Sequence, residues 1–444
     1  MNPEAIFREI LGTDSKRWDS ANAALLEQLR ERGCTYGGRE MVRVLRPKFL
    51  GSGDYAYLDY ICGVIMGVFR RLSGMVLGNE DLVEFLNVSD QERELAEIEP
   101  LCPDPCAVAR LDTFHTVDGP RFVELNGEAP AGPGFCEVAA DAFNDHPAIQ
   151  ELVRRTGAHS LSTMEGLKNG LLMAWRASGR RGRPRILITD YLDVPTSNEF
   201  EIVAGYLRRH DLEVVVEDTR KLEYQDGRLV AQGQPIDLVY RRVLTNEFLQ
   251  HLTEVRPLLD AYRDRAVVVV DPFRAKLVHK KSAFALLTGD LLGEDWLTVE
   301  ERRVIGRHMP WTRRVRETRA MHGEEEVDLL PYLLENRDNF VLKPSDEYGG
   351  KGVVVGWECD ESQFQSALDE ALAGDYVAQE RIRTVEESFP LIERDLEEQP
   401  MIVDLDPYVY MGRVHGLLAR LSAGALCNVT SGGGQTPVFL YPDP

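Results

Sequence analysis

The spacing of hydrophobic and polar positions divides the chain into regions of different character. In the first hundred residues, apolar side chains recur every three or four positions, which predicts helices over residues 20–33 and 57–72. Between residues 108 and 126, apolar and polar side chains alternate on both sides of an Asp-Gly pair. This pattern is typical of two strands joined by a tight turn. We therefore expect a mainly helical N-terminal region that leads into a β-hairpin.

A different pattern follows the basic stretch at residues 179–185, whose glycines and proline indicate a linker. Strand-like and helix-like runs then alternate. We expect strands at residues 185–191, 211–218, 235–242 and 266–272, and helices at residues 198–210 and 247–264. Strands that alternate with helices favour a parallel sheet, so we predict a small α/β domain over about residues 180–272.

The remaining residues, from 273 onwards, combine strands, helices and glycine-containing loops. We predict a strand, a glycine loop and a second strand over residues 339–358, then a helix at 361–374 and a strand at 376–382. The acidic stretch at 386–398 suggests a solvated loop, and residues 401–444 suggest antiparallel strands around an SGGGQ loop. The predicted regions are thus 1–178, 179–272 and 273–444, with an overall α+β architecture that contains an α/β insert.

Composition narrows the classes of partner. The chain has 73 acidic and 51 basic residues, a formal charge of −22, and 43% hydrophobic residues. Such acidity argues against nucleic acid or an anionic membrane as the principal partner, and the hydrophobic content argues against disorder. The chain shows no secretory signal or membrane-spanning run, and its seven cysteines are scattered. We therefore expect a cytoplasmic protein with reduced thiols.

A nucleotide-binding pattern lies in the segment from Phe340 to Gly356. An apolar strand leads to Lys343, and a loop with Gly349, Gly350 and Gly352 follows. Glycines allow backbone N–H groups to approach a phosphate, and a lysine supplies positive charge. The segment is not a Walker A loop, because that spacing is absent and no helix follows. An ordinary hairpin with a solvated lysine explains this segment equally well.

Two further segments favour the nucleotide interpretation. The strand that includes Gln379 and Glu380 offers polar groups at a strand edge, where adenine and ribose can bind. Upstream, Lys280 and Lys281 belong to a cluster of basic residues in an otherwise acidic chain. Taken together, the segments follow the order of an ATP-grasp fold, in which a first lysine precedes a second lysine, a glycine flap and an adenine hinge.

The predicted hairpin carries a candidate metal site. Arg110 and Asp112 lie two residues apart on its first strand, and Glu124 and Asn126 lie two apart on its second. Spacing by two places both side chains of a strand on one face, so the turn can bring all four together. Carboxylate and amide oxygens suit Mg²⁺, and Arg110 could neutralise a transferring phosphoryl group. The alternatives are a hairpin whose polar face meets water, or metal ligands at Asp404 and Asp406.

These motifs resemble those of glutathionylspermidine synthetase and eukaryotic glutathione synthetase. The resemblance rests on RLD followed twelve residues later by ELN, and then on KKSA, KPSDEYGGKG, AQERI, ARLS and SGGG in this order. It covers about residues 100–444 and leaves the first hundred residues unmatched. The resemblance implies a circularly permuted ATP-grasp core, in which the metal-binding strands precede the nucleotide-binding lysines, with a Rossmann-like preATP-grasp domain.

Site residues follow from the same resemblance, position by position. It makes Asp112, Glu124 and Asn126 the Mg²⁺ ligands and assigns Arg110 to the transition state of acyl-phosphate formation. The ATP-binding residues that it implies are Lys281, with Lys280 as an alternative, Lys343, Gly349, Gly350, Gly352, Gln379, Glu380 and Ile382.

Substrate-binding residues are implied near the C-terminus. The resemblance places Arg420 at a substrate carboxylate and Gly432, Gly433 and Gly434 in a substrate-closing loop. In the α/β insert, Arg241 and Arg242 end a strand, where they either meet an anionic substrate or lie at the surface.

The expected function is an ATP- and Mg²⁺-dependent ligase that joins a small-molecule carboxylate to an amine, or to a thiol, through an acyl phosphate. The alternatives are a kinase and a nucleotide-binding scaffold without catalysis. The resemblance is compatible with a homodimer. Nothing in the sequence specifies which acid or which amine reacts, and no fused amidase domain fits within the chain.

Overall fold

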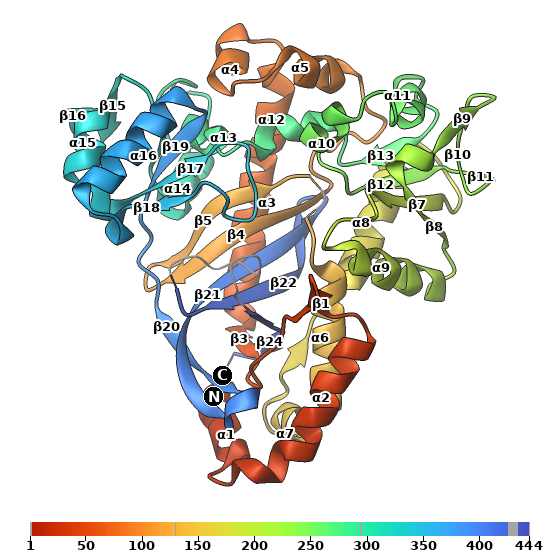
Figure 1. The fold of residues 1–444 in the computed structure, drawn as a ribbon, viewed down its shortest axis with the longest axis vertical. Helices are drawn as coiled ribbons and strands as arrows, with labels where there is room; N and C mark the ends of the chain where they lie inside the picture. The colour runs from red at the N-terminus through yellow and green to blue at the C-terminus, as the bar shows by residue number, and fades with distance from the viewer. Residues whose placement is uncertain (1, 129, 294, 425–433, 444) are drawn as a thin grey trace.

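A central antiparallel sheet joins the two halves of the chain. The computed structural model describes residues 2–128, 130–293, 295–424 and 434–443. The sheet has the order β23-β22-β21-β4-β5, and β20 also pairs with β21. Its strands are β4 (Val108–Thr116), β5 (Gly119–Asn126), β20 (Glu386–Leu391), β21 (Glu397–Tyr410), β22 (Arg413–Ser422) and β23 (Gly434–Thr436). The predicted hairpin is confirmed, and C-terminal strands lie beside it in the same sheet (Figure 1).

The N-terminal region is mainly helical, as predicted. Its elements are α1 (Pro3–Leu11), α2 (Asp19–Glu31), β1 (Thr35–Tyr36), β2 (Arg39–Glu40), β3 (Lys48–Gly51), α3 (Ser52–Val76), α4 (Glu80–Phe85) and α5 (Asp90–Glu97). Helix α3 buries Ile61, Ile65 and Phe69, spaced by four residues, in the same core as Leu111 and Leu125 of the hairpin. The core side of the sheet is therefore opposite its polar side. Although α3 has 25 residues, neither it nor any other described helix is apolar enough to cross a membrane.

A smaller sheet brings a strand near the C-terminus beside two strands from the first half of the chain. Strand β24 (Val438–Tyr441) pairs in parallel with β3 and antiparallel with β6 (His159–Ser160). Helices α6 (Pro133–Asp145) and α7 (Pro147–Thr156) connect the hairpin to this sheet and pack against α2 and α1 at the lower end of the molecule (Figure 1).

The insert forms the predicted parallel sheet, in the order β13-β12-β7-β8. Helix α8 (Thr163–Ala177) precedes it, and its elements are β7 (Arg185–Asp190), α9 (Ser197–Arg209), β8 (Glu213–Asp218), β9 (Glu223–Gln225), β10 (Arg228–Ala231), β11 (Gln234–Pro235), β12 (Leu238–Arg241), α10 (Thr245–Gln250), α11 (Arg256–Arg263) and β13 (Val268–Val270). The single helix expected at 247–264 is wrong: two helices form, because Pro257 has no backbone N–H to continue the first helix and lies instead in the first turn of a second one.

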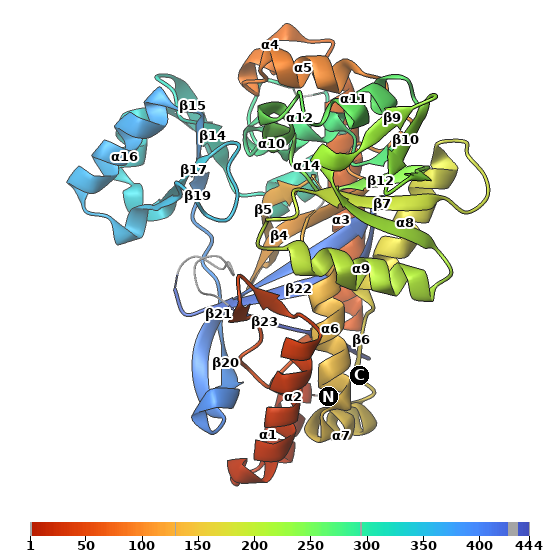
Figure 2. The same ribbon diagram turned by 45° about the vertical axis from the view of Figure 1, so that its right-hand side comes forward.

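A lid lies on the other side of the central sheet from the insert (Figure 2). Its sheet has the order β14-β19-β17-β18. The lid and its connection comprise α12 (Lys276–His279), α13 (Ser282–Leu287), α14 (Val299–His308), β14 (Thr312–Arg314), β15 (Arg319–His322), β16 (Glu325–Asp328), α15 (Leu329–Glu335), β17 (Phe340–Pro344), β18 (Val354–Val355), α16 (Glu361–Ala373) and β19 (Tyr376–Glu380). The strand, glycine loop and strand predicted here are confirmed, since β17 and β18 pair antiparallel.

The acidic stretch at residues 386–398 is not the solvated loop that its charge suggested. Most of it forms β20 and the start of β21, which pair antiparallel. Part of its charge is compensated, since Glu387 forms ion pairs with Arg46, at 2.8 Å, and with Lys48. Sequence reasoning missed this strand because the compensating cations come from a segment more than three hundred residues away.

Candidate active site

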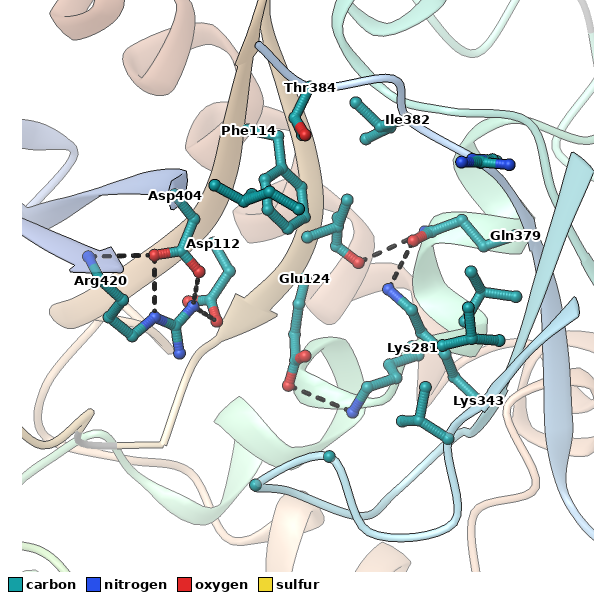
Figure 3. A pocket seen from close by; sticks show the side chains of 18 of the residues that line it. Asp112, Phe114, Glu124, Lys281, Lys343, Gln379, Ile382, Thr384, Asp404 and Arg420 are labelled. Carbon is teal, nitrogen blue, oxygen red and sulfur yellow. Dashed lines mark hydrogen bonds and ion pairs between the residues drawn. The ribbon is translucent and has the colours of Figure 1, made fainter. Parts of the chain in front are cut away.

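A cavity of about 670 Å³ lies between the central sheet and the lid. Strands β4, β5, β21 and β22 form one wall, and the lid strands with the glycine loop form the other (Figure 3). Twelve of the predicted site residues line it: Arg110, Asp112, Glu124, Asn126, Lys281, Lys343, Gly349, Gly350, Gln379, Glu380, Ile382 and Arg420. Residues more than three hundred positions apart in the sequence thus meet in one cavity.

The hairpin presents its polar side chains through its pairing. Asp112 lies opposite Glu124, and Arg110 lies opposite Asn126. The register shifts immediately afterwards, so that Val123 becomes an extra residue between two pairs. Because of this bulge, Val123 and Glu124 both line the cavity, while Phe122 turns into the core. Simple alternation would have placed Phe122 on the same face as Glu124, and the sequence did not indicate the bulge.

Asp112 is surrounded by nitrogen donors. Arg110 Nε lies 2.9 Å from one carboxylate oxygen, and Arg420 Nη2 lies 2.6 Å from the other. The side-chain amide of Asn126 also donates to Asp112, at 2.7 Å. Burial favours the protonated form, but the two guanidinium groups outweigh it and hold the pKa of Asp112 well below its ordinary value. Asp112 is therefore ionised at neutral pH.

Arg420 binds carboxylates of the protein itself. Its Nη2 lies 2.7 Å from Asp404 and 2.9 Å from Asp406, in addition to its contact with Asp112 (Figure 3). Burial raises the pKa of Asp404 to about 6 and raises that of Asp406 further, although Arg420 opposes both shifts. Asp404 also lines the cavity. The C-terminal carboxylates, which were an alternative to the hairpin as metal ligands, thus join the same cluster.

Two lysines converge on the cavity from the lid side. Lys281 Nζ lies 3.1 Å from Glu124 Oε1 and donates to the backbone oxygen of Glu347 at 2.6 Å. Lys343 Nζ donates to Gln379 Oε1 at 2.7 Å. Burial lowers the pKa of Lys343 to about 8, so an anionic ligand would favour its charged form. Both lysines occupy positions that suit a phosphate group.

The neighbouring Lys280 points the other way. Its Nζ donates to the backbone oxygen of Asn87 and to Glu92, at 2.7 and 2.9 Å. Of the two candidates for the first lysine, the structure therefore brings Lys281 and not Lys280 to the cavity. The sequence alone could not separate them, because adjacent residues share the same local pattern.

The glycine loop has a backbone that favours glycine. Gly349, Gly350 and Gly352 have φ values of 67°, 77° and 71°. Gly349 and Gly350 line the cavity, whereas a Cβ on Gly352 would lie only 2.8 Å from Pro344 Cγ. Gly434 begins β23, next to the backbone of Met41. Gly432 and Gly433, predicted to belong to a substrate-closing loop, lie outside the described residues.

The end of the cavity near Ile382 is apolar. Val341, Val355 and Trp357 line it, and the Arg381 guanidinium lies 3.9 Å from the centroid of the Trp357 ring. An apolar wall with an aromatic ring suits a planar heterocycle. Sequence reasoning missed Trp357 and Arg381, although a tryptophan directly after the second strand of the glycine hairpin was a usable signal.

A second cavity, of about 270 Å³, opens between the hairpin and the insert. It reaches the carboxyl ends of β7 and β12, where Asp190 and Arg242 line it. The chain order along the sheet reverses between these two strands, a position at which α/β sheets commonly bind ligands. The second cavity shares five lining residues with the first: Arg110, Asn126, Tyr348, Gly349 and Arg420.

Neither arginine at the end of β12 lies at the surface. Arg241 is 1% exposed and pairs with Glu128 at 2.8 Å, and Arg242 is 6% exposed and pairs with Glu199 at 3.1 Å. The surface alternative for these residues is therefore wrong, and only Arg242 lines the second cavity. Burial raises the pKa of the neighbouring Asp190 to about 7, although Arg242 opposes the shift. Asp190 was missed, but its place at the end of a parallel strand was a signal.

Comparison of the sequence with known proteins finds a partial match. No family model matches the chain. A protein of Frankia casuarinae named "Putative glutamate--cysteine ligase 2-2" is 31% identical over 117 residues, which represent 24% of this chain and 13% of that relative. The chain thus matches only a small part of the relative's length.

A solved structure matches over almost the whole chain. It is a glutathione synthetase-like effector from Globodera pallida in its apo form, with a TM-score of 0.65, 12% identity, and coverage of 97% of this chain and 98% of that one. The chain has a glutathione synthetase-like fold. At this level of identity the likeness concerns the fold, with its mixed α and β content, and carries no information on the substrate.

The cavity of this glutathione synthetase-like fold can be tested for its fit to Mg²⁺. Asp112, Glu124 and Asn126 supply only oxygen-bearing side chains from one face of the hairpin, which is the donor type that Mg²⁺ requires. In the described part of the chain, no three His, Cys, Asp or Glu side chains are placed to hold a metal by themselves. Mg²⁺ is usually held by one or two carboxylates together with substrate phosphates. The residues therefore fit a Mg²⁺ ion that is shared with a nucleotide.

Proposed function

We propose that the protein is an ATP-dependent carboxylate–amine ligase that forms an amide bond through an acyl phosphate. One observation carries the proposal: a cavity with lysines and a glycine loop meets a second cavity, and both are lined by Arg110, Asn126 and Arg420. ATP occupies the first cavity in this proposal, and the acid substrate occupies the second. The shared residues are the place where the γ-phosphate and the substrate carboxylate would meet.

The first cavity has separate features for each part of ATP. Lys281 and Lys343 provide positive charge for the phosphates, and the loop at Gly349 and Gly350 offers close backbone approach. The apolar end near Trp357 and Ile382 suits the adenine ring. Gln379, which bonds Lys343, and Glu380, which follows it, would bind polar groups of the base or ribose.

Asp112, Glu124 and Asn126 would hold Mg²⁺ together with the phosphates. When bound, the ion supplies neutralisation of the charge that develops on the transferring phosphoryl group. Lys281, which pairs with Glu124, and Arg110, which pairs with Asp112, orient the two carboxylates within the cavity. This arrangement depends on the glutathione synthetase-like fold, because its two walls come from the hairpin and the lid.

The reaction proceeds in two steps in this proposal. A carboxylate oxygen of the substrate attacks the γ-phosphorus in line, the bond to ADP breaks, and an acyl phosphate forms. Arg110 lies between the two cavities, where it would neutralise charge on the phosphoryl oxygens. An amine then attacks the acyl carbon, loses a proton, and phosphate leaves. Closure of the lid would exclude water, which would otherwise hydrolyse the acyl phosphate.

We also propose a circularly permuted ATP-grasp arrangement with a preATP-grasp domain at residues 179–272. The support is the order of the elements: the hairpin precedes the lid in the sequence, and β21 and β22 follow the lid. The two hairpin strands, β4 and β5, nevertheless belong to the same sheet as β21 and β22. The parallel order of the insert sheet supports a Rossmann-like domain there.

The proposal is tested by measuring ADP release in the presence of Mg²⁺ across a panel of carboxylic acids and amines, with mass spectrometry of the products. A ligase gives ADP release that depends on an acid, together with a condensed product. ADP release that needs no added acid would count against the proposal. A stable phosphorylated product formed without condensation would instead identify a kinase, and absence of any turnover across the panel would favour a nucleotide-binding scaffold.

A further inference from the structure

A second group of charged residues lies at the start of the glycine loop; none of them lines the first cavity, and one of them, Glu128, lines the second. Ion pairs within 4.0 Å connect three cations to three carboxylates. The six residues come from α5, the end of the hairpin, the insert, α12 with the turn after it, and the lid. We call this the rear cluster, and its members are Glu92, Glu128, Arg241, Lys276, Lys280 and Asp346.

The cations of the rear cluster are buried, the Asp346 side chain is 22% exposed, and the cluster is electrically balanced. Lys276, Lys280 and Arg241 are 1%, 3% and 1% exposed. Asp346 forms an ion pair with Lys276 and lies 4.0 Å from Lys280. Without Asp346, three buried cations would face two carboxylates. An uncompensated buried charge is strongly unfavourable, so Asp346 is held in place by the charges of the other five residues.

Asp346 belongs to the root of the glycine loop. The backbone oxygen of the preceding Ser345 accepts a hydrogen bond from the backbone N–H of Lys281 at 2.8 Å. The backbone N–H of Ser345 donates to the backbone oxygen of Asp375 at 2.7 Å. The following residue, Glu347, accepts from Lys281 Nζ at 2.6 Å. The loop is therefore bound on both sides of Asp346, before its first glycine.

The insert also holds this root. Asn246 on α10 donates to Asp346 at 3.0 Å, and its neighbour Glu247 accepts from the Tyr348 hydroxyl at 3.3 Å. The two contacts connect the glycine loop to the domain that forms the second cavity, and both Glu247 and Tyr348 line that cavity.

We infer that Asp346 is a positioning residue that clamps the root of the glycine loop, so that the loop moves over the nucleotide only by bending at Gly349–Gly352. The clamp keeps Glu347 against Lys281 and thereby holds this lysine in the cavity. Lys280, which directly precedes Lys281 in the chain, contributes to the clamp because its Nζ lies 4.0 Å from the Asp346 carboxylate. The kinetic part of this inference rests on the proposed function, whereas the clamp itself does not.

Trypsin cleavage after Lys351 measures the clamp directly. The Lys351 side chain is 76% exposed and lies within the loop. Asp346→Asn should increase the rate of cleavage at this bond about fivefold or more, because the ion pair that holds the root of the loop against Lys276 is lost and the loop opens more often. The matched control is Asp369→Asn, an exposed carboxylate on α16 of the same lid. Cleavage products are quantified by mass spectrometry on the full-length protein, without nucleotide.

Two further variants separate the clamp from general destabilisation. Asp346→Glu keeps the carboxylate and should restore slow cleavage. The double variant Asp346→Asn with Lys280→Gln restores charge balance, so its melting temperature should recover while cleavage stays fast. The inference is overturned if Asp346→Asn is cut at the rate of the control, or if the double variant recovers slow cleavage together with stability.

A kinetic measurement then links the clamp to catalysis. In the ADP-release assay, Asp346→Asn should raise the KM for ATP by about fivefold or more, and Asp346→Glu should reverse most of this change. An unchanged KM for ATP in Asp346→Asn would contradict the positioning role. If the parent protein forms no ADP with any acid, the proposed function fails, but the cleavage comparison still decides whether the clamp exists.

Discussion

Two buried groups of charges flank the glycine loop and Lys281, and they differ in their balance. The rear cluster has three cations and three carboxylates. The group at the cavity, here called the cavity cluster, has two guanidinium groups and three carboxylates: Arg110, Arg420, Asp112, Asp404 and Asp406. The rear cluster is thus neutral, whereas the cavity cluster has an excess of one negative charge when all its groups are ionised.

This difference in charge balance suggests a structural role for the rear cluster and a binding role for the cavity cluster. A balanced and buried ionic network orients the segments that supply it. The cavity cluster is not balanced when all its groups are ionised, and burial raises the pKa of Asp404 to about 6, although Arg420 opposes the shift. A cation bound in the cavity would supply the missing charge. We therefore expect changes in the cavity cluster to affect turnover and changes in the rear cluster to affect stability.

The largest expected effect concerns Asp112. Asp112→Asn should reduce ADP formation by about 10³-fold or more, because a proposed Mg²⁺ ligand and the partner of Arg110 are lost together. The free energy of unfolding should fall, because the two guanidinium groups stabilise the ionised carboxylate, but it should fall less than for a rear-cluster carboxylate, since two guanidinium groups would then face two carboxylates. Turnover and urea unfolding are measured on the same preparation, with Asp369→Asn as the control. Retention of full turnover would remove the distinction between the two clusters.

In the rear cluster, the larger effect of a substitution should be on the free energy of unfolding rather than on turnover. Glu128 pairs with Arg241 at 2.8 Å, and interaction with Arg241 and Lys276 lowers its pKa to about 2 despite burial. Glu128→Gln should therefore lower the free energy of unfolding by about 3–5 kcal/mol, because two buried cations lose a partner. Adding Lys276→Gln restores the balance and should recover part of this loss in urea unfolding. A single variant as stable as the parent would show that the balance is irrelevant.

A pH dependence is expected from Asp190 in the second cavity. Burial raises its pKa from 3.8 to about 7, so the folded state binds a proton more tightly than the unfolded state. This contribution to stability is present at acidic pH, decreases as the pH rises from about 4 to about 7, and stays constant above. Asp190→Asn should remove this decrease and stabilise the protein at pH 8 by about 1–3 kcal/mol.

Thermal unfolding of Asp190→Asn and of the parent between pH 5 and pH 8 provides the measurement. The difference between them should grow with pH. Equal melting temperatures at pH 8, or a difference that is the same at every pH, would show that Asp190 is not the group responsible.

The smallest effect is expected for Arg242. Its guanidinium pairs with Glu199 at 3.1 Å in the wall of the second cavity. Arg242→Lys keeps the positive charge but loses the planar guanidinium group, which can bind a carboxylate through two hydrogen bonds. The KM for the acid substrate should therefore rise about tenfold while kcat changes little. The ADP-release assay at varied acid concentration measures both constants. An increase in the KM for ATP instead would assign Arg242 to the first cavity.

Local sequence patterns were sufficient for much of the fold and for most of the candidate site. Spacing by two predicted that Arg110 and Asp112 share one face of their strand, because strand side chains alternate regardless of what surrounds them. The same spacing predicted a shared face for Glu124 and Asn126, and the pairing of the two strands brings these faces together. Alternating strands and helices predicted the parallel insert in the same way. The position of Lys343 before a glycine loop was likewise visible in a short segment.

Other features depend on contacts between distant parts of the chain. The bulge at Val123 appears only when β5 pairs with β4. The different directions of Lys280 and Lys281 follow from Glu92 on one side and Glu124 on the other. Local periodicity contains no information on which distant charges will be buried beside a residue.

The sequence by itself therefore determined which residues are candidates for the proposed chemistry, through spacing, order and residue type. Only the tertiary structure decided how they are grouped, since Arg420 reaches Asp112 across 308 positions and Lys276 reaches Asp346 across 70. The physical reason is that an unpaired buried charge is costly, and a buried charge pairs with whichever partner the fold brings within a few ångströms.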